Sequence, residues 1–519
     1  MRLLGKDEIK PEEPMGKERQ MFVVFASILL LAAVIFLTGF AADTRAAGID
    51  LSDTDITKAV ENNLREDPAV FANLIDVTTL TGVVTLSGRV PNLLSSERAV
   101  RIAESIKGVR AVVNTLQVVP PLRSDQNIRR DIEDALLADP AADSYEIRVM
   151  VENGIATLTG TVESRAEKQL AGRVAKAVRG LKQLNNDIMV KHVANRSDEE
   201  IKRDIEGRLK WNVYVDDILI DVNVTFGNVV LSGIVGSAAE KTQAIQDVWV
   251  AGVRSVDATG LEVEWWTREE MRKKQPFVAK PDEEIKKAVE DAFLYDPRVA
   301  SFKVDVEVDM GLVTLNGVVD SLIAKRSAEM DARHTAGVRW VENRLKVRTA
   351  EPPADYRLEE DVRNALQRNN LLERYEFTVS VLNQTAYLYG TVDSHYEKML
   401  AKDVASRVVG VTEVANYITV SQVWQWKSDA EIKADVEGEL FWSPYVDSED
   451  ITVKVEDGDV TLEGVATDWA EADAAVGNAF EGGARSVRAR LDLADGSEYV
   501  RYYAHDYEYY WYGHFYGTL

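Results

Sequence analysis

Short segments in which apolar and polar residues alternate recur six times along the chain. In one of them, alternation from Ile147 to Val151 is followed by Asn153-Gly154 and by a second alternating run that ends at Gly160. A period of two is typical of a half-buried strand, and Asn-Gly favours the tight turn that joins two antiparallel strands. We therefore predict a β-hairpin in each segment.

A glycine closes the second strand of each hairpin and sets the period of the repeat. The six closing glycines are Gly88, Gly160, Gly233, Gly317, Gly390 and Gly464. They follow one another at about 73 residues, with one interval of about 84 residues, and a fixed period of this length indicates repeated domains. Glycine also stands at the turn of five hairpins, whereas the fifth has Asn383-Gln384. We assign the closing glycines a structural role, because turn geometry favours a residue without a Cβ atom.

A predicted amphipathic helix precedes each hairpin and another follows it. The first helix has apolar residues at positions i, i+4 and i+8, as in Ile56, Val60 and Leu64, which places one apolar stripe on a single face. The second helix, for example from Ala166 to Val178, leads to a glycine and a further apolar strand. The order helix, strand, strand, helix, strand predicts an α+β module in which two helices cover one face of a three-stranded mixed sheet.

The period divides most of the chain into six small tandem modules. We number them 1 to 6, at residues 52–120, 124–191, 197–265, 281–348, 355–421 and 428–495. The closing glycines of modules 4 to 6 follow those of modules 1 to 3 at about 230 residues, which indicates a duplicated triplet. Residues 266–280 join the triplets and are the predicted hinge or linker, and residues 496–519 form a C-terminal tail rich in aromatic residues.

The N-terminal region contains one long apolar segment. Residues 21–42 carry no charge and are long enough to cross a bilayer as a transmembrane signal-anchor helix. Lys and Arg are more frequent in residues 1–20 than after the span, which predicts a cytoplasmic N-terminus, a single pass through the bacterial inner membrane and periplasmic modules. The alternative is cleavage as a signal peptide, for example near Gly39-Phe40-Ala41, which would leave a soluble periplasmic protein.

Together these motifs resemble the BON domain, the module of bacterial osmotically inducible periplasmic proteins. The resemblance rests on Gly82–Val90 (GVVTLSGRV), Gly154–Val162 (GIATLTGTV) and Gly311–Val319 (GLVTLNGVV), each followed by a glycine-led turn, and it covers residues 52–495. The fifth copy lacks the turn glycine, and the sixth has Gly482-Gly483-Ala484 in place of the usual pair. The resemblance implies a non-enzymatic envelope module that acts at phospholipid surfaces or in envelope assemblies and is linked to stress tolerance.

Composition excludes several partners and several kinds of chemistry. With 86 Asp and Glu against 61 Lys and Arg, the net charge of −25 disfavours nucleic-acid binding, which depends on cations that neutralise phosphates. The chain has no cysteine, so disulfides, thiolate metal sites, a cysteine nucleophile and a lipid-modified N-terminal cysteine are all excluded.

No arrangement of residues predicts catalysis. The five histidines fall at unrelated repeat positions, and no Ser-His-Asp or histidine–carboxylate arrangement recurs. His505 and His514 stand near Asp506 and Glu508 in the tail, but we predict no metal site there. We therefore predict no catalytic residue, no metal, no cofactor and no small-molecule substrate.

Aromatic residues are the candidates for interaction with lipid or protein. Only modules 3 and 6, the third members of the two triplets, have a Trp followed three residues later by a Tyr: Trp211 with Tyr214, and Trp442 with Tyr445. These side chains either cover a module interface or insert at a lipid headgroup layer. The tail contributes further candidates, whose density indicates docking on the protein itself, on a neighbouring copy or on a membrane. These are Tyr509, Tyr510, Trp511, Tyr512 and Phe515.

Two functional hypotheses follow. In the first, the chain is a membrane-anchored envelope protein whose modules bind phospholipid or other envelope surfaces and support envelope integrity under osmotic stress. In the alternative, it is a structural protomer that forms a homo-oligomeric ring or larger envelope assembly through its modules and tail. Net negative charge disfavours long-range attraction to anionic lipid, which would need basic patches.

Overall fold

The computed structural model describes most of the chain after its N-terminal region. The described residues are 51–67, 69–139, 147–191, 196–266, 280–299, 302–349, 351, 353–421 and 427–504. The predicted membrane helix, the segment before it, most of the hinge and the tail candidates from Tyr509 to Phe515 lie outside these residues. Among the helices that are described, none is long and apolar enough to cross a membrane.

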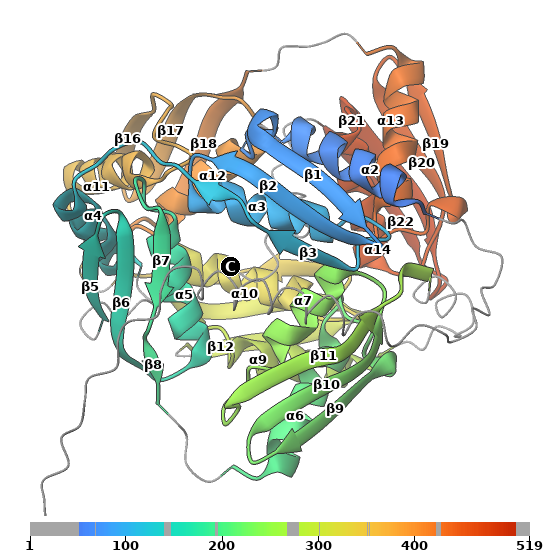
Figure 1. Cartoon of the computed structure of the whole chain (residues 1–519), viewed down its shortest axis with the longest axis horizontal. Coiled ribbons are helices and arrows are strands. Elements are labelled where there is room, and N and C mark those ends of the chain that lie inside the picture. Colours follow the sequence, from blue (N-terminus) through green and yellow to red (C-terminus); the bar gives the residue numbers. More distant parts are fainter. Residues whose placement is uncertain are drawn as a thin grey trace, which may run out of the picture. The chain divides into compact units, whose positions relative to one another are not determined.

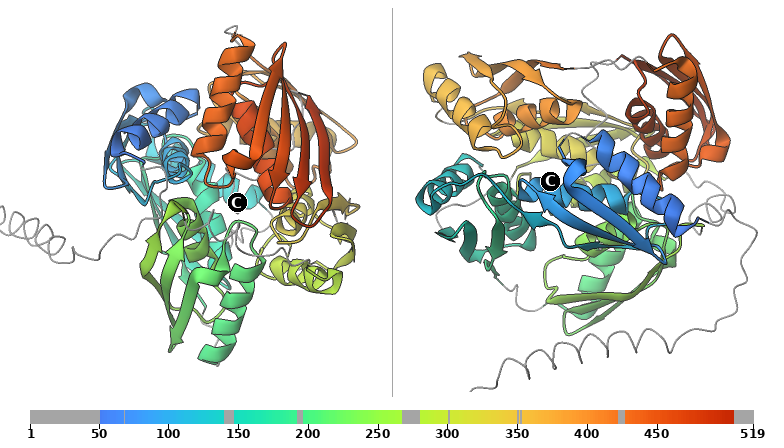
Figure 2. Two further views of the ribbon diagram at one scale, coloured as in Figure 1. Left: turned by 90° about the vertical axis from the view of Figure 1, so that its right-hand side faces the viewer. Right: turned by 45° about the horizontal axis from the view of Figure 1, so that its top comes forward.

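Each module places two helices against one face of a small mixed sheet (Figures 1 and 2). The second hairpin strand is central, with the first strand antiparallel on one side and the last strand parallel on the other. This is the α+β arrangement predicted from the repeat. In modules 1, 2 and 4 the last strand is interrupted, so that two short strands pair in succession with the central one.

The helices and hairpins occupy equivalent positions in the six modules. The first helices are α2 (Asp53–Glu66), α4 (Asp125–Ala138), α6 (Asp198–Trp211), α9 (Asp282–Phe293), α11 (Asp355–Arg368) and α13 (Asp429–Trp442). The second helices are α3 (Leu93–Glu104), α5 (Arg165–Lys176), α7 (Ala238–Asp247), α10 (Leu322–Arg333), α12 (His395–Ser406) and α14 (Trp469–Glu481). The hairpins are β1 (Ile75–Leu80) with β2 (Val83–Val90), β5 (Ile147–Glu152) with β6 (Ile155–Val162), β9 (Ile220–Thr225) with β10 (Asn228–Val235), β12 (Val304–Asp309) with β13 (Leu312–Val319), β16 (Thr378–Leu382) with β17 (Thr385–Val392), and β19 (Ile451–Glu456) with β20 (Asp459–Ala466).

The last strands complete the sheets. They are β3 (Ala111–Asn114) and β4 (Gln117–Val118), β7 (Gln183–Asn186) and β8 (Met189–Val190), β11 (Ser255–Val263), β14 (Trp340–Asn343) and β15 (Lys346–Val347), β18 (Glu413–Val420), and β21 (Ser486–Leu493). The apolar stripe of every first helix is buried against its sheet, as Ile56, Val60 and Leu64 illustrate at no more than 4% exposure. Each such side chain contributes about 1.5–3 kcal/mol when fully buried, so the stripe fixes the orientation of the helix.

An aspartate at the first position of each first helix holds the hairpin turn of the same module. Asp53 accepts hydrogen bonds from the N–H groups of Thr81 and Gly82 at 2.7 and 2.9 Å. The corresponding pairs of bonds in the other five modules measure between 2.7 and 3.1 Å. The aspartate therefore ties each helix to the far end of the sheet, beyond any favourable effect of negative charge on the helix N-terminus.

Asp355 explains how module 5 keeps this turn without a glycine. It accepts hydrogen bonds from Asn383 and Gln384, whose φ angles are 50° and 65°. Positive φ is tolerated by asparagine but strains a glutamine. The replacement Gln384→Gly is therefore expected to stabilise module 5 by about 1 kcal/mol, measured as a higher urea midpoint of unfolding.

The same substitution in a helix provides the control for this prediction. Gln367 is exposed on α11, where a glycine costs about 1 kcal/mol, so Gln367→Gly should lower the midpoint. If both variants lower it, the strain assigned to Gln384 is wrong.

The closing glycines have a steric role that is clearest at Gly233. Its φ is 116°, and a Cβ atom there would lie 1.9 Å from the carbonyl oxygen of Leu219. All six closing glycines have positive φ. A side chain at Gly233 would push the start of β9 away from β10, so the glycine is needed for the two strands to approach.

The sheet of module 6 extends into the region predicted to be a tail outside the modules. Strand β22 (Glu498–Ala504) pairs antiparallel with β21 and gives the order β19-β20-β21-β22. Tyr499 and Tyr503 are buried, and their hydroxyl groups are 2.8 Å apart. Residues 498–504, which the sequence analysis placed in the tail outside the modules, therefore belong to the sheet of module 6. The alternation of buried and exposed residues along this segment is that of a strand, and the strand covers the otherwise open edge of β21.

Candidate interaction sites between modules

One backbone contact recurs at three places and joins the modules in pairs. A glycine follows the second helix of each module, and the residue just before that glycine is the donor. Its N–H donates to the carbonyl of the last residue of the first helix of another module. The bonds are Lys107 to Trp442 at 2.8 Å (modules 1 and 6), Arg179 to Arg368 at 3.0 Å (modules 2 and 5), and Ala336 to Trp211 at 2.8 Å (modules 4 and 3). Modules 1 and 6, 2 and 5, and 3 and 4 therefore form equivalent pairs.

Two of these pairs are closed by a second backbone bond. Asn370 donates to the carbonyl of Ala177 at 2.9 Å, and Val213 donates to that of His334 at 3.0 Å. Each of these two pairs is thus joined by an isolated antiparallel bridge. Backbone bonds of this kind fix the register of two modules without depending on side-chain identity.

The structure brings the four aromatic candidates of the third modules to these contacts. Trp211 packs against the core of module 4, and Trp442 packs against the core of module 1. Tyr214 lies edge-on to Tyr445, with ring centroids 5.8 Å apart, and edge-on to His334 at 5.1 Å. These side chains therefore contact other modules of the same chain.

Burial sets the charge state of this aromatic cluster. It raises the pKa of the Tyr214 hydroxyl, and it lowers the pKa of His334 to about 4, with a further contribution from the neighbouring Arg333. His334 is therefore neutral at physiological pH. The cluster holds modules 3, 4 and 6 together mainly by ring packing.

Two arginines that were not singled out in the sequence connect further modules. Arg98 forms an ion pair with Asp67, and its guanidinium lies 3.7 Å from the ring centroid of Tyr396 in module 5. Arg298 in module 4 forms an ion pair with Asp139 in module 2 at 3.2 Å. A feature of the sequence could have indicated both arginine contacts. An Asp-Pro pair follows the first helix in modules 1, 2 and 4 only. The aspartates of two of these pairs are the ones that bind the arginines.

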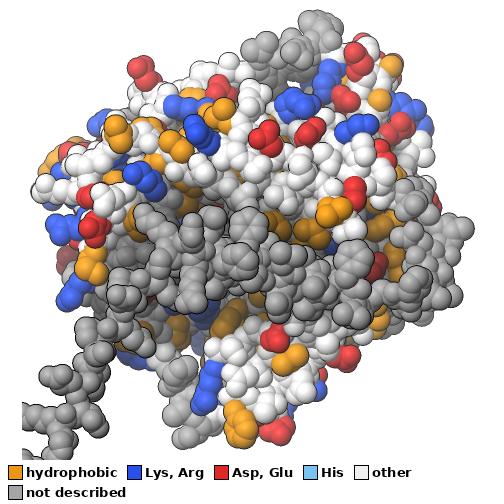
Figure 3. All heavy atoms as spheres, viewed as in Figure 1, with side chains coloured by type: hydrophobic (Ala, Val, Ile, Leu, Met, Phe, Trp, Pro, Cys, Tyr) orange, Lys and Arg blue, Asp and Glu red, His pale blue; other side chains and the backbone are white. Residues whose placement is uncertain are grey.

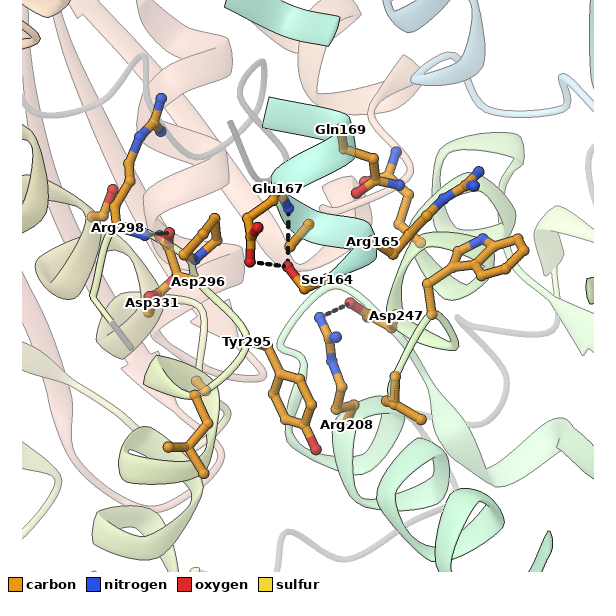
Figure 4. Close-up of a pocket in the computed structure, with 18 of the residues that line it drawn as sticks. Ser164, Arg165, Glu167, Gln169, Arg208, Asp247, Tyr295, Asp296, Arg298 and Asp331 are labelled. Atoms are coloured by element: carbon orange, nitrogen blue, oxygen red, sulfur yellow. Dashed lines mark hydrogen bonds and ion pairs between the residues drawn. The ribbon is translucent and has the colours of Figure 1, made fainter. Parts of the chain in front are cut away.

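Modules 2 to 5 line a cavity of about 1700 Å³. Figure 4 shows part of its wall, with Arg165 and Gln169 of α5, Tyr295 of module 4, and Arg208 of module 3 beside Asp247. Arg208 donates to Asp247 at 3.2 Å and lies 4.5 Å from the ring centroid of Tyr295. The cavity therefore combines aromatic surface with charged groups drawn from four modules.

Within the described ranges, no three His, Asp or Glu residues are grouped so that they could hold a metal ion. His192, His505 and His514 lie outside those ranges.

Comparison with known proteins identifies the repeated module. Residues 52–120, 124–192, 197–264, 281–349, 354–422 and 428–494 each match the BON domain. This chain belongs to the BON-domain family. The resemblance predicted from the hairpin glycines and helix stripes is thereby confirmed.

Two curated proteins are similar to parts of this BON-domain chain. Osmotically-inducible protein Y of Escherichia coli is 34% identical over 148 residues, which are 27% of this chain and 74% of that protein. Outer membrane lipoprotein DolP of Haemophilus influenzae is 26% identical over 176 residues, 30% of this chain and 91% of that protein. These relatives therefore correspond to less than a third of the BON chain.

A solved structure also matches with a low score. The C-terminal domain of CdsD, a structural protein of the type III secretion system of Chlamydia trachomatis, is 18% identical, with 41% of this chain and 100% of that chain covered. The TM-score is 0.12, so the likeness carries no argument about how the BON modules assemble.

Proposed function

We propose that this chain is a non-enzymatic protein of the bacterial envelope whose BON modules bind phospholipid or other envelope surfaces and support envelope integrity under osmotic stress. Residues 21–42 would anchor it in the inner membrane, with the modules in the periplasm. The observation that carries the proposal is the 34% identity to Osmotically-inducible protein Y across 74% of that protein. The similarity to a protein named as an outer membrane lipoprotein adds a second relative from the envelope.

The hairpin ends offer a surface for contact with lipid. Large apolar side chains are exposed at the hairpin ends of four modules: Leu80 at 74%, Phe226 at 78%, Met310 at 73% and Leu382 at 60%. Single exposed apolar residues are common on proteins, but here they recur at the same end of the repeat. Apolar side chains at the end of a rigid hairpin can insert shallowly into the headgroup region of a membrane.

Charge limits the kind of membrane that such hairpins would bind. The chain carries a net charge of −25, and Figure 3 shows acidic and basic side chains interspersed over the described part of one face. Long-range attraction to anionic lipid depends on basic clusters. The proposed binding therefore depends on apolar insertion and should be strongest on zwitterionic vesicles.

A flotation experiment tests this proposal. We expect residues 43–519 to float with vesicles of phosphatidylethanolamine and phosphatidylcholine at low salt. The double variant Phe226→Asp/Met310→Asp should float at least about tenfold less, because each apolar side chain contributes about 1.5–3 kcal/mol when buried.

The control for this experiment is Leu122→Asp. Leu122 is 96% exposed in the connection between modules 1 and 2, away from any hairpin end, so its variant should float like the parent. Failure of the parent to float would remove lipid binding from the proposal. Equal flotation of the double variant would remove the hairpin ends.

The alternative function is that of a self-assembling structural protomer. The recurring backbone contact favours it, because the BON modules of this chain pair with one another through the same contact at three places. The mass of the detergent-extracted full-length protein tests it. An assembly that is lost on removal of residues 505–519 would support a role of the tail as a connector, and a monomer with or without these residues would exclude the assembly. The truncation starts after Ala504 because β22 belongs to module 6.

A further inference from the structure

Helix α5 forms one wall of the cavity that modules 2 to 5 line. Arg165, Gln169 and Arg173 follow one another at intervals of four residues and all line the cavity. Residues four apart lie on the same face of a helix. The helix therefore presents two guanidinium groups and an amide to the same space.

Arg173 lacks a counterion among the described residues. No described residue forms a hydrogen bond or ion pair with its guanidinium, and its Nε is buried without a partner. Burial, together with the neighbouring Arg298 and Arg407, lowers the pKa of Arg173 to about 9. Asp139 and Asp296 act in the opposite direction, but Asp139 is already bound by Arg298. An uncompensated cation of this kind is costly in a folded protein.

Arg165 repeats this situation at the start of α5. Its guanidinium lies 4.3 Å from the ring centroid of Trp249 in module 3, and its Nε is also buried without a hydrogen-bond partner. Burial lowers the pKa of Arg165, and burial together with Arg165 lowers that of Lys168. Arg165 and Lys168 therefore repel each other, although Asp187 partly offsets this at Lys168, and neither Arg165 nor Arg173 forms an ion pair with a described residue.

Two buried carboxyl groups of the cavity lining are not available to pair with these cations. Asp247 is held by Arg208, Asn212 and Gln243. Burial and the neighbouring Asp296 raise the pKa of Asp331 well above its ordinary range, which disfavours its charged form. Neither of these two carboxyl groups forms an ion pair with Arg165 or Arg173.

We propose that this wall of α5 binds an anionic oxygen group, a phosphate or a carboxylate, carried by a water-soluble small molecule. Guanidinium groups bind such anions through planar, charge-assisted hydrogen bonds. Ligand pockets commonly measure about 300–1000 Å³, and the cavity of about 1700 Å³ exceeds this range. The ring of Trp249 beside Arg165 provides an apolar surface for the uncharged part of the ligand. The sequence analysis predicted no small-molecule substrate, and it gave no sign of a cavity whose lining comes from four modules.

Calorimetric titration of the full-length protein in detergent tests the proposal with two probes, inorganic phosphate and citrate, in a buffer low in other anions. At least one probe should bind saturably, and the probe that binds more tightly distinguishes a phosphate from a carboxylate ligand. Arg173→Gln should weaken binding at least tenfold. The control Arg148→Gln, an exposed arginine on β5 outside the cavity lining, should bind as the parent does.

Thermal unfolding of the same proteins gives a second measurement that does not depend on ligand identity. Arg173→Gln should raise the midpoint of the protein without added anion, because it removes an uncompensated cation. The probe should raise the midpoints of the parent and of Arg148→Gln to the same extent, and that of Arg173→Gln much less. The proposal is overturned if neither probe binds saturably, if Arg173→Gln binds as tightly as the parent, or if Arg148→Gln loses binding to the same extent.

Discussion

Replacement of Arg298 by methionine is expected to destabilise the contact between modules 2 and 4 by about 3–5 kcal/mol. Arg298 and Asp139 are 4% and 2% exposed, and their charged groups are 3.2 Å apart. Methionine keeps much of the side-chain volume but removes the ion pair that the buried carboxylate of Asp139 forms with Arg298. The measurement is the urea midpoint of unfolding of residues 43–519, with limited proteolysis to locate the loosened module.

A surface ion pair provides the matched control. Arg344 and Glu342 are 2.8 Å apart, but their side chains are 57% and 46% exposed, so Arg344→Met should cost no more than about 1 kcal/mol. Adding Asp139→Asn to Arg298→Met should recover part of the loss, because the uncompensated charge is then gone. If Arg298→Met costs no more than Arg344→Met, the buried pair does not hold the two modules together.

The contact between modules 1 and 6 is expected to weaken as the pH rises from 6.5 to 9. Burial, followed by the nearby carboxylates of Glu481, Glu66 and Asp435, raises the pKa of Glu439 to about 9, and Lys427 partly offsets this. Asn63 donates to Glu439 at 3.5 Å across the contact. Burial also raises the pKa of Glu481 to about 7. Both acids are thus favoured in their protonated forms when the modules are packed.

The sign of the effect follows from these directions. A carboxyl group whose folded-state pKa lies above the unfolded value of about 4.3 stabilises the fold fully below that value and loses this contribution as the pH rises through the folded-state pKa. Each such group changes the free energy of unfolding by about 1.4 kcal/mol per pH unit between the two values. The decline should end near pH 9. His334 does not contribute in this window, because its ordinary and folded-state pKa values both lie at or below 6.5.

Glu439→Gln should flatten most of this pH dependence, as measured by the urea midpoint at intervals from pH 6.5 to 9. The control is Glu437→Gln on the same helix, where the side chain is 53% exposed and lies 3.6 Å from Lys433. It should leave the slope unchanged. A slope that is equal in Glu439→Gln and in the parent would contradict the prediction. The equivalent position in module 3 is Arg208, which is paired with Asp247.

The fold of each module could be predicted from the sequence because its signals are local. The stripe from Ile56 to Leu64 and the turn at Asn153-Gly154 depend on spacing within a few residues, and both are found as predicted. The strand at 498–504 was not predicted, because residues 496–519 were assigned as a whole to an aromatic C-terminal tail. Their alternation, with Tyr499 and Tyr503 on the buried face, was the better indication.

Contacts between modules could not be predicted in the same way. The bond from Lys107 to Trp442 joins residues hundreds of positions apart, and no local pattern specifies such a pairing. The same holds for the cavity, whose lining combines α5 with residues of three other modules. Modules 1, 2 and 4 have the Asp-Pro pair, and the same three modules donate the recurring backbone bond. Modules 3, 5 and 6 lack the pair and accept the bond. This distinction is visible in the sequence, but its meaning depends on the structure.

The recurring backbone bond also indicates how a chain of this kind could have arisen. Lys107 and Ala336 occupy the same position in the two triplets, and so do Trp442 and Trp211. The first triplet therefore donates to the second and accepts from it through the same pair of positions, which is the isologous pattern of a twofold symmetric homodimer. Covalent linkage of the two halves replaces association between separate subunits by a high effective concentration within one chain. The two triplets thus correspond to the two subunits of a dimer encoded in a single chain, and they were free to diverge, as Arg208 and Glu439 have done.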